Sequence, residues 1–168
     1  YIYFQNLMLN QIQKNIIKAI FIISLVALIT AYFVEYILGY QPCNLCLMER
    51  LPYAAALLII LISYKLKHLE KQFILLLIII FFAASILSLY HLGIEQGLIK
   101  ESLVCDLQNS LKILSKEEIL QQLQEKKVNC KDVTFKIFGL SLTTFNIIIS
   151  ILLTTTLTKI YLNYEKNK

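Results

Sequence analysis

The chain has 168 residues, of which 58% are hydrophobic, and its mean hydropathy is +0.67. These values exclude an ordinary soluble domain of this size and favour a single membrane domain. The net charge of +5 does not indicate nucleic-acid binding, because the lysines are not clustered among aromatic residues. We expect one domain over residues 8–168, with residues 1–7, ahead of Met8, as an extension outside the fold.

Four apolar runs are long enough, or nearly so, to cross a bilayer as helices, which takes about 20 residues. They cover residues 16–38, 51–66, 73–92 and 138–160. The second run is short, and it reaches spanning length if its helix begins near Leu47. Apolar residues do not alternate with period two, so a β-barrel is not expected. The predicted fold is an all-α bundle of four transmembrane helices.

The positions of the lysines predict how this bundle is oriented. Four spans place eight lysines on one side of the membrane: Lys14, Lys18, Lys65, Lys67, Lys71, Lys159, Lys166 and Lys168. On the other side, Arg50 is the only basic residue of the short loop 39–50. The long loop 93–136 contains seven lysines and seven acidic residues, so its charges balance. Basic residues in short loops mark the cytoplasmic side. Both termini are therefore expected in the cytoplasm, with a short and a long periplasmic loop that hold all four cysteines.

Glu35 is the one acidic residue in the first run. A carboxylate at the bilayer centre would cost about 2.5–3.5 kcal/mol, but Tyr32, Tyr36 and Tyr40 place the outer interface close to Glu35. Two interpretations remain open. Glu35 either extends to the interface as an ordinary carboxylate or handles protons within the membrane.

The long loop contains the pattern of an amphipathic helix. Ser115 and Glu118 have the spacing of a capping box, in which each side chain binds a backbone amide at the helix start. Ile119, Leu120 and Leu123 then follow at helical spacing. We expect this short helix to lie on the membrane surface.

Cys43 and Cys46 form a CxxC motif in the polar break before the second run. Such a pair is typical of a redox dithiol or of half a metal site. Pro52 is tolerated only in the first turn of a helix, so the second helix is expected to begin between Leu47 and Arg50. The positive end of that helix and the Arg50 side chain would both favour a thiolate at Cys46.

Two further cysteines, Cys105 and Cys130, lie in the long loop. Cysteines on the non-cytoplasmic side of a membrane are normally oxidised. Closing the loop between Cys105 and Cys130 would stabilise the fold by about 3 kcal/mol, which fits a structural disulfide. A bridge between Cys43 and Cys46 closes almost no loop, and such pairs typically exchange. The motif therefore favours electron transfer between thiols and an acceptor in the membrane.

Metal and haem sites are less well supported. Zinc requires converging ligands, and the second cysteine pair is C-x24-C rather than a second CxxC. Covalent haem requires a histidine directly after the CxxC motif, where this chain has Leu47. His68 and His91 are expected on opposite sides of the membrane. His91 is then either a helix cap or a neighbour of a cofactor.

Several stretches, in this order along the chain, resemble the disulfide-bond-formation protein B (DsbB) family of bacterial inner-membrane oxidases. They are residues 41–53 (QPCNLCLMERLPY), residues 90–95 (YHLGIE), Cys105, Cys130, residues 138–142 (FGLSL) and Asn146. The resemblance extends over essentially all of the chain after Met8. It implies a four-helix membrane enzyme with protein-dithiol:quinone oxidoreductase activity.

The resemblance also implies partners and roles for the cysteines. Electrons would pass from a periplasmic, thioredoxin-like (DsbA-like) oxidase to ubiquinone or menaquinone in the bacterial inner membrane. Cys105 would accept the thiolate of the partner and form the substrate-facing pair with Cys130. Cys43 and Cys46 would form the quinone-coupled pair, with Cys46 as the thiolate beside the quinone.

Three more residues acquire roles by the same resemblance. Arg50 would orient the quinone, and His91 and Glu95 would lie near it. No metal is implied. The chain departs from the family at Phe135 and Phe145, where relatives often carry tryptophan, but these changes remove no reactive group.

Two other classes of protein remain as alternatives. A non-enzymatic membrane scaffold with structural disulfides would have inert cysteines and no bound quinone. A protein like vitamin K epoxide reductase is also a four-helix thiol oxidase linked to quinone. In that group the CxxC motif follows the loop cysteines in the sequence, whereas here it precedes them.

Overall fold

The computed structural model describes residues 2–66, 69–100, 130–131, 136–137 and 139–166. Five helices and two short strands are defined in these ranges. They are α1 (Ile2–Tyr36), α2 (Asn44–Met48), α3 (Leu51–Lys65), α4 (Glu70–Glu95), β1 (Lys136–Ile137), β2 (Leu140–Ser141) and α7 (Leu142–Lys166).

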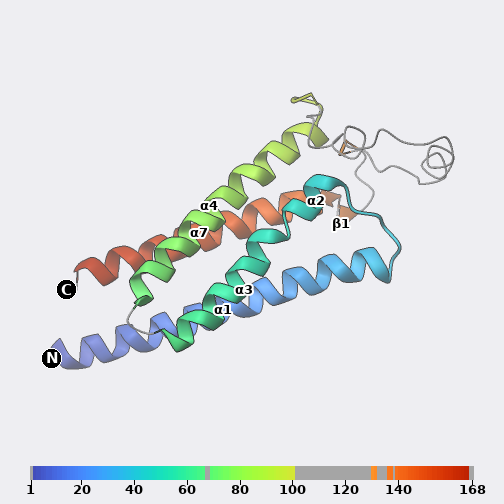
Figure 1. Cartoon of the computed structure of the whole chain (residues 1–168). Helices are drawn as coiled ribbons and strands as arrows, with labels where there is room; N and C mark the ends of the chain where they lie inside the picture. Colours follow the sequence, from blue (N-terminus) through green and yellow to red (C-terminus); the bar gives the residue numbers. More distant parts are fainter. Residues whose placement is uncertain (1, 67–68, 101–129, 132–135, 138, 167–168) are drawn as a thin grey trace, which may run out of the picture.

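Four segments of this structure are long and apolar enough to cross a membrane, which confirms the predicted spans. They are Lys14–Tyr36, Asn44–Lys65, Lys71–Glu95 and Leu142–Asn163. Helix α4 packs along α7 and against α3, and α3 packs along α1. The start of α1 and the end of α7 lie at the same end of the bundle, with α2 at the opposite end (Figure 1). A chain that crosses the membrane four times has both of its ends on the same side, as seen here.

The second span is interrupted, and this differs from the sequence prediction. A single helix was expected to begin between Leu47 and Arg50, but α2 already begins at Asn44, with Cys43 as its N-cap. The chain then turns at Glu49 and Arg50 before α3 begins at Leu51 with Pro52 in its first turn. Proline has no amide hydrogen, so it is favourable at a new helix start and unfavourable in a continuous helix. Pro52 therefore marks the start of α3 rather than the start of the span.

The fourth span also begins later than predicted. In place of helix from residue 138, the chain forms an antiparallel β1–β2 hairpin in which Ile137 pairs with Leu140. Gly139 has a φ of +82°, a conformation that glycine adopts at no steric cost, and it turns the chain between the strands. Ser141 then caps α7, accepting a hydrogen bond from the Thr144 amide at 3.3 Å. The amphipathic helix expected after residue 115 lies outside the described residues.

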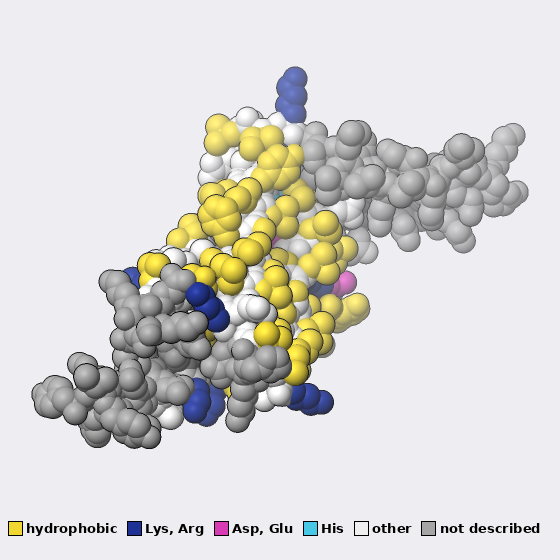
Figure 2. All heavy atoms as spheres, turned by 60° about the vertical axis from the view of Figure 1, so that its left-hand side comes forward, with side chains coloured by type: hydrophobic (Ala, Val, Ile, Leu, Met, Phe, Trp, Pro, Cys, Tyr) yellow, Lys and Arg dark blue, Asp and Glu magenta, His cyan; other side chains and the backbone are white. Residues whose placement is uncertain are grey.

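The main core lies between the four spans. Its buried side chains come from every spanning helix: Ile20, Tyr53, Ala56, Ile60, Ile74, Leu77, Phe81, Leu153, Leu157 and Ile160. Hydrophobic side chains cover much of the visible outer face, and lysine or arginine side chains lie toward its ends (Figure 2). Because lipid is as apolar as the core, close packing rather than burial of apolar surface holds these helices together.

Phe81 and Phe82 provide a matched test of this packing. Phe81 is fully buried and packs edge-to-face on Tyr53, with ring centroids 5.8 Å apart, whereas Phe82 is 56% exposed. We expect Phe81→Ala to lower the free energy of unfolding by about 3–5 kcal/mol through the cavity that it leaves. Phe82→Ala should have a much smaller effect. Unfolding in mixed micelles with increasing SDS measures both, and equal losses would contradict the assignment of the core.

Candidate functional site

The CxxC motif forms the first turn of α2, at the end of the bundle away from the chain termini (Figure 1). Cys43 has an extended backbone and serves as the N-cap, so its sulfur accepts a hydrogen bond from the Cys46 amide at 3.3 Å. The two sulfurs are 2.7 Å apart. Cys43 is buried and Cys46 is partly buried. The helix start thus directs a backbone donor at Cys43 rather than at Cys46.

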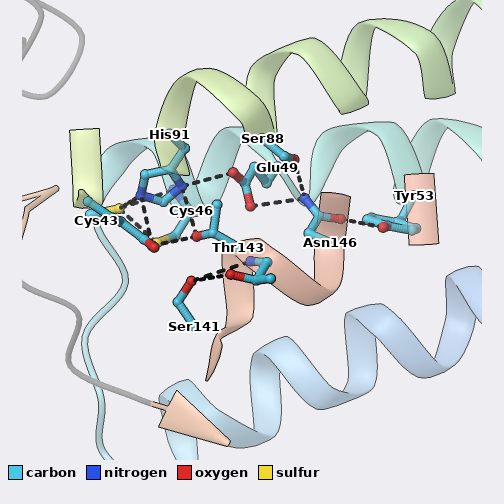
Figure 3. Close-up of polar contacts among 11 residues, drawn as sticks. Cys43, Cys46, Glu49, Tyr53, Ser88, His91, Ser141, Thr143 and Asn146 are labelled. Atoms are coloured by element: carbon cyan, nitrogen blue, oxygen red, sulfur yellow. Dashed lines mark hydrogen bonds and ion pairs between the residues drawn. The ribbon is translucent and has the colours of Figure 1, made fainter. Parts of the chain in front are cut away.

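His91 projects from α4 against this turn (Figure 3). Its Nε2 lies 3.5 Å from the Cys43 sulfur, and its Nδ1 lies 2.8 Å from Oε1 of Glu49. The Thr143 hydroxyl is 3.3 Å from the same Nδ1 and donates to Glu95 at 2.6 Å. The His91 side chain is only 1% exposed. An imidazole therefore lies directly between a sulfur and a carboxylate inside the protein.

Glu49 is held by a second set of polar side chains (Figure 3). Its Oε2 accepts a hydrogen bond from the Asn146 amide nitrogen at 2.9 Å. The same nitrogen donates to the Ser88 hydroxyl at 2.7 Å, and the Tyr53 hydroxyl donates to the Asn146 oxygen. Residues from α3, α4 and α7 thus fix the carboxylate that contacts His91.

Cys130 lies beside the CxxC motif, although its position in the chain is distant. It is 3% exposed and packs in one cluster with Cys43, Leu45 and Ile94. Cys130 is in a disulfide bond. Its predicted partner, Cys105, lies outside the described residues. The structure therefore places one loop cysteine next to the cysteine with which sulfur exchange would occur.

Arg50 points toward α1 rather than toward His91. Its guanidinium forms an ion pair with Glu35 and lies over the Tyr32 ring, 5.0 Å from the centroid. The Arg50 and Glu35 side chains are 13% and 21% exposed. Glu35 is therefore a counter-ion of Arg50, a contact that neither interpretation of the sequence included.

These groups border one cavity of about 480 Å³. Six of the predicted site residues line it: Cys43, Cys46, Arg50, His91, Glu95 and Cys130. One wall consists of apolar side chains of α1, among them Ile22, Ile23 and Val26. Phe145, which stands where relatives often carry tryptophan, lines another part of the cavity. The cavity thus brings reactive thiols, one cation and an apolar surface together.

The local contacts favour a negative charge on Cys43. Its pKa is lowered to about 5, chiefly because the Cys46 thiol forms a hydrogen bond to its sulfur. Burial opposes this shift, and the His91 side chain and the Cys46 amide add to it. These contacts therefore favour the thiolate form of Cys43 when the pair is reduced. The sequence also predicts a thiolate at Cys46. This stays a prediction, and it concerns the state in which Cys43 is joined to another cysteine and Cys46 is free.

Three potential ligand atoms, from Cys43, Cys46 and His91, lie within 4.8 Å of one another. Two thiolates on a tetrahedral zinc ion would be about 3.8 Å apart, because each Zn–S bond is about 2.3 Å. The observed sulfur separation is 2.7 Å, which is too short for such a site. The geometry therefore fits disulfide chemistry better than zinc binding.

Sequence reasoning missed the roles of Glu49, Ser88 and Thr143 in this site. Glu49 was part of the family-like motif, but no role was assigned to it. A general signal was present, since polar or charged residues inside apolar spans commonly mark functional sites. Ser88 and Thr143 are too common as small helix residues for their identity alone to have indicated these contacts.

Comparison with known proteins identifies the family of this chain. The family model described as disulfide bond formation protein DsbB matches residues 13–160. The chain belongs to the DsbB family. An uncharacterized protein of Rickettsia prowazekii (strain Madrid E) is 34% identical over 156 residues, which cover 88% of this chain and 90% of the relative. No solved structure matches the chain.

Membership of the DsbB family, together with four spanning helices, makes this a multi-pass membrane protein of disulfide-bond formation. The family activity is that of an oxidoreductase. The paired thiols of Cys43 and Cys46 provide a redox site of the kind that this activity requires.

The pKa of Cys43 predicts its reactivity. Alkylation of Cys43 by iodoacetamide in the reduced protein should reach half its maximal rate near pH 5, because only the thiolate reacts. In Cys46→Ala, which removes the principal hydrogen-bond donor, the midpoint should rise but stay below the ordinary value of about 8.5, because the His91 contact remains. Mass spectrometry of the peptide that contains Cys43 measures both rates. The same midpoint in both proteins would show that Cys46 does not stabilise the Cys43 thiolate.

Proposed function

We propose that this protein is a protein-dithiol:quinone oxidoreductase. It reoxidises a periplasmic, thioredoxin-like partner of the DsbA type by disulfide exchange and passes the electrons to ubiquinone or menaquinone. The observation that carries this proposal is the single cavity lined by Cys43, Cys46, Cys130 and Arg50. An inert scaffold has no need for reactive thiols, a cation and an apolar wall in one place.

The cavity residues fit a quinone as the electron acceptor. A volume of about 480 Å³ lies in the usual range for small-molecule sites, and the α1 side chains offer an apolar surface for a ring. Arg50 provides hydrogen-bond donors for a carbonyl oxygen. Cys46 lines the same cavity, and His91 and Glu95 border it. A quinone would supply the capacity to accept two electrons and two protons.

We propose the following order of exchange. A partner thiolate attacks the loop disulfide at Cys105 and forms a mixed disulfide, which releases Cys130. Cys130 then attacks the Cys43 sulfur of the Cys43–Cys46 disulfide, and the electron pair of the broken bond passes to Cys46. The packing of Cys130 against Cys43 supports this second step.

We further propose that the protein lies in the bacterial inner membrane with both termini in the cytoplasm. Eight lysines on one side of the four spans support this orientation. The cavity at the α2 end of the bundle is then near the periplasmic face, the side on which a soluble partner would meet the long loop.

The exchange order predicts which covalent intermediate accumulates. The full chain should form a persistent mixed disulfide at Cys105 with a DsbA-type partner that keeps only its attacking cysteine. The partner thiolate breaks the Cys105–Cys130 bond, and the partner has no second thiol to release itself from Cys105. A non-reducing gel after incubation with this reduced single-cysteine partner detects the adduct. Cys105→Ser should form no adduct while its Cys43–Cys46 pair stays oxidisable by quinone. An adduct that persists in Cys105→Ser and maps to Cys43 would refute the order.

The role of Arg50 predicts a defect confined to quinone. Removing a charged hydrogen-bond donor typically costs about 1.5–3 kcal/mol, so Arg50→Ala should raise the apparent KM for quinone by about tenfold or more. Arg50→Lys should retain part of the activity, because it keeps the charge but loses the planar guanidinium. Initial rates of quinone reduction at varied quinone concentration measure this. Unchanged quinone kinetics in Arg50→Ala would remove Arg50 from the site.

A further inference from the structure

The His91 imidazole contacts the Cys43 sulfur on one side and the Glu49 carboxylate on the other. Its Nε2 is 3.5 Å from the Cys43 sulfur, and its Nδ1 is 2.8 Å from Glu49. A neutral imidazole carries one N–H, and the carboxylate can only accept, so the hydrogen lies on Nδ1. The Nε2 lone pair then faces the Cys43 sulfur, where it can take the thiol proton.

The Glu49 carboxylate is restrained for this purpose. Asn146 donates to its second oxygen at 2.9 Å, and Asn146 is itself bound to Ser88 and to Tyr53. The Glu49 side chain is 11% exposed and that of His91 is 1% exposed, so solvent screens their interaction little. A buried, braced carboxylate of this kind fixes both the tautomer and the orientation of the imidazole.

We propose that Glu49, His91 and Cys43 form a proton relay that serves sulfur exchange at Cys43. His91 is the catalytic base that takes the Cys43 proton, and Glu49 is a positioning residue that holds the imidazole and stabilises its charged form. This assignment rests on the proposed function, because it gives the relay a task in the exchange between Cys43 and Cys130. It adds a role on the thiol side to the one that family resemblance implies for His91 near the quinone.

The relay determines which sulfur carries negative charge at each step. When a thiolate attacks Cys130 in a Cys130–Cys43 disulfide, a new bond forms at Cys130 and the Cys130–Cys43 bond breaks. The electron pair then stays on the Cys43 sulfur, beside the imidazolium. In the reduced pair, the Cys43 thiol proton moves to Nε2 of His91 and leaves a thiolate. With the proposed quinone as oxidant, this thiolate would re-form the bond to Cys46, while the quinone accepts the two electrons and two protons of the dithiol.

Other ionisable groups also face this relay. Cys46 contacts Cys43, and Cys130 packs beside it. Glu95 lies 3.8 Å from Nε2 of His91 and accepts the Thr143 hydrogen bond. Arg50 and Glu35 line the same cavity but pair with each other. Only His91 places a potential positive charge within hydrogen-bonding distance of the Cys43 sulfur among the described residues.

The test uses the full chain with Cys43 as its sole cysteine (Cys46→Ser, Cys105→Ser and Cys130→Ser), purified in detergent. The measured quantity is the pH at which iodoacetamide alkylation of Cys43 is half-maximal. His91→Gln should raise this midpoint by about one to three pH units, as expected when a neighbouring positive charge is lost. Glu49→Gln should raise it in the same direction by less, and Glu49→Asp should restore part of the shift.

Two controls separate the relay from a general disturbance. Ser85→Ala removes a hydroxyl of α4 that donates to the Phe82 carbonyl and lies outside the cavity lining, so it should leave the midpoint nearly unchanged. Each variant must also retain its midpoint of SDS unfolding, because an unfolded chain would show an ordinary thiol. An unchanged midpoint in folded His91→Gln would overturn the relay, and so would an equal shift in Ser85→Ala. The assay needs neither quinone nor partner, so failure of the proposed enzymatic activity would be seen separately.

Discussion

The contacts of Glu49 connect the parts of this site. One oxygen binds His91 of α4 and the other binds Asn146 of α7, while Glu49 itself belongs to the turn between α2 and α3. In a lipid environment, buried polar groups have no water to bind and must find partners within the protein. This requirement draws three segments together at one point. The position of the CxxC turn relative to α4 depends on it.

The break at Glu49 and Arg50 allows neighbouring residues to face different partners. Glu49 points to His91, and Arg50 points to Glu35 and Tyr32 on α1. In one uninterrupted helix, adjacent residues also diverge, but their directions would be set by the helix as a whole. Here the turn allows each side chain to reach its partner separately. The same short segment thus provides the Glu49 carboxylate, which contacts His91, and the Arg50 guanidinium, which lines the cavity.

Much of the fold was predictable from the sequence because apolar length alone identifies a spanning helix. All four spans were found in this way, and the CxxC cysteines and Arg50, which the sequence singled out, line one cavity. The start of α2 at Asn44 was not predicted, because a single turn of helix before Pro52 leaves no periodicity to detect. The late start of α7 depends on a turn at Gly139, and one glycine is a weak signal.

Contacts between distant residues were the part that the sequence could not supply. Glu35 was correctly noted as unusual, but its ion pair with Arg50 depends on how α1 packs against the α2–α3 segment. The hydrogen bonds of Glu49 to His91 and Asn146 likewise join residues 42 and 97 positions apart. Local propensity carries no information about such pairs. Only the packing of the helices decides which polar groups in the spans meet.

Among the described residues, two of the three carboxylates that line the cavity, Glu35 and Glu49, contact a side chain that is or can become positively charged. Glu35 compensates Arg50, and a protonated His91 would compensate the Glu49 carboxylate. An unpaired charge within a membrane is costly, so each new negative charge on sulfur must be matched nearby. Hydrogen-bond donors at Cys43 provide this match on the thiol side, and Arg50 is the cation available on the cavity side. On the proposed function, movement of electrons between the thiols and the cavity would therefore require movement of protons, and the proposed relay assigns this task to His91.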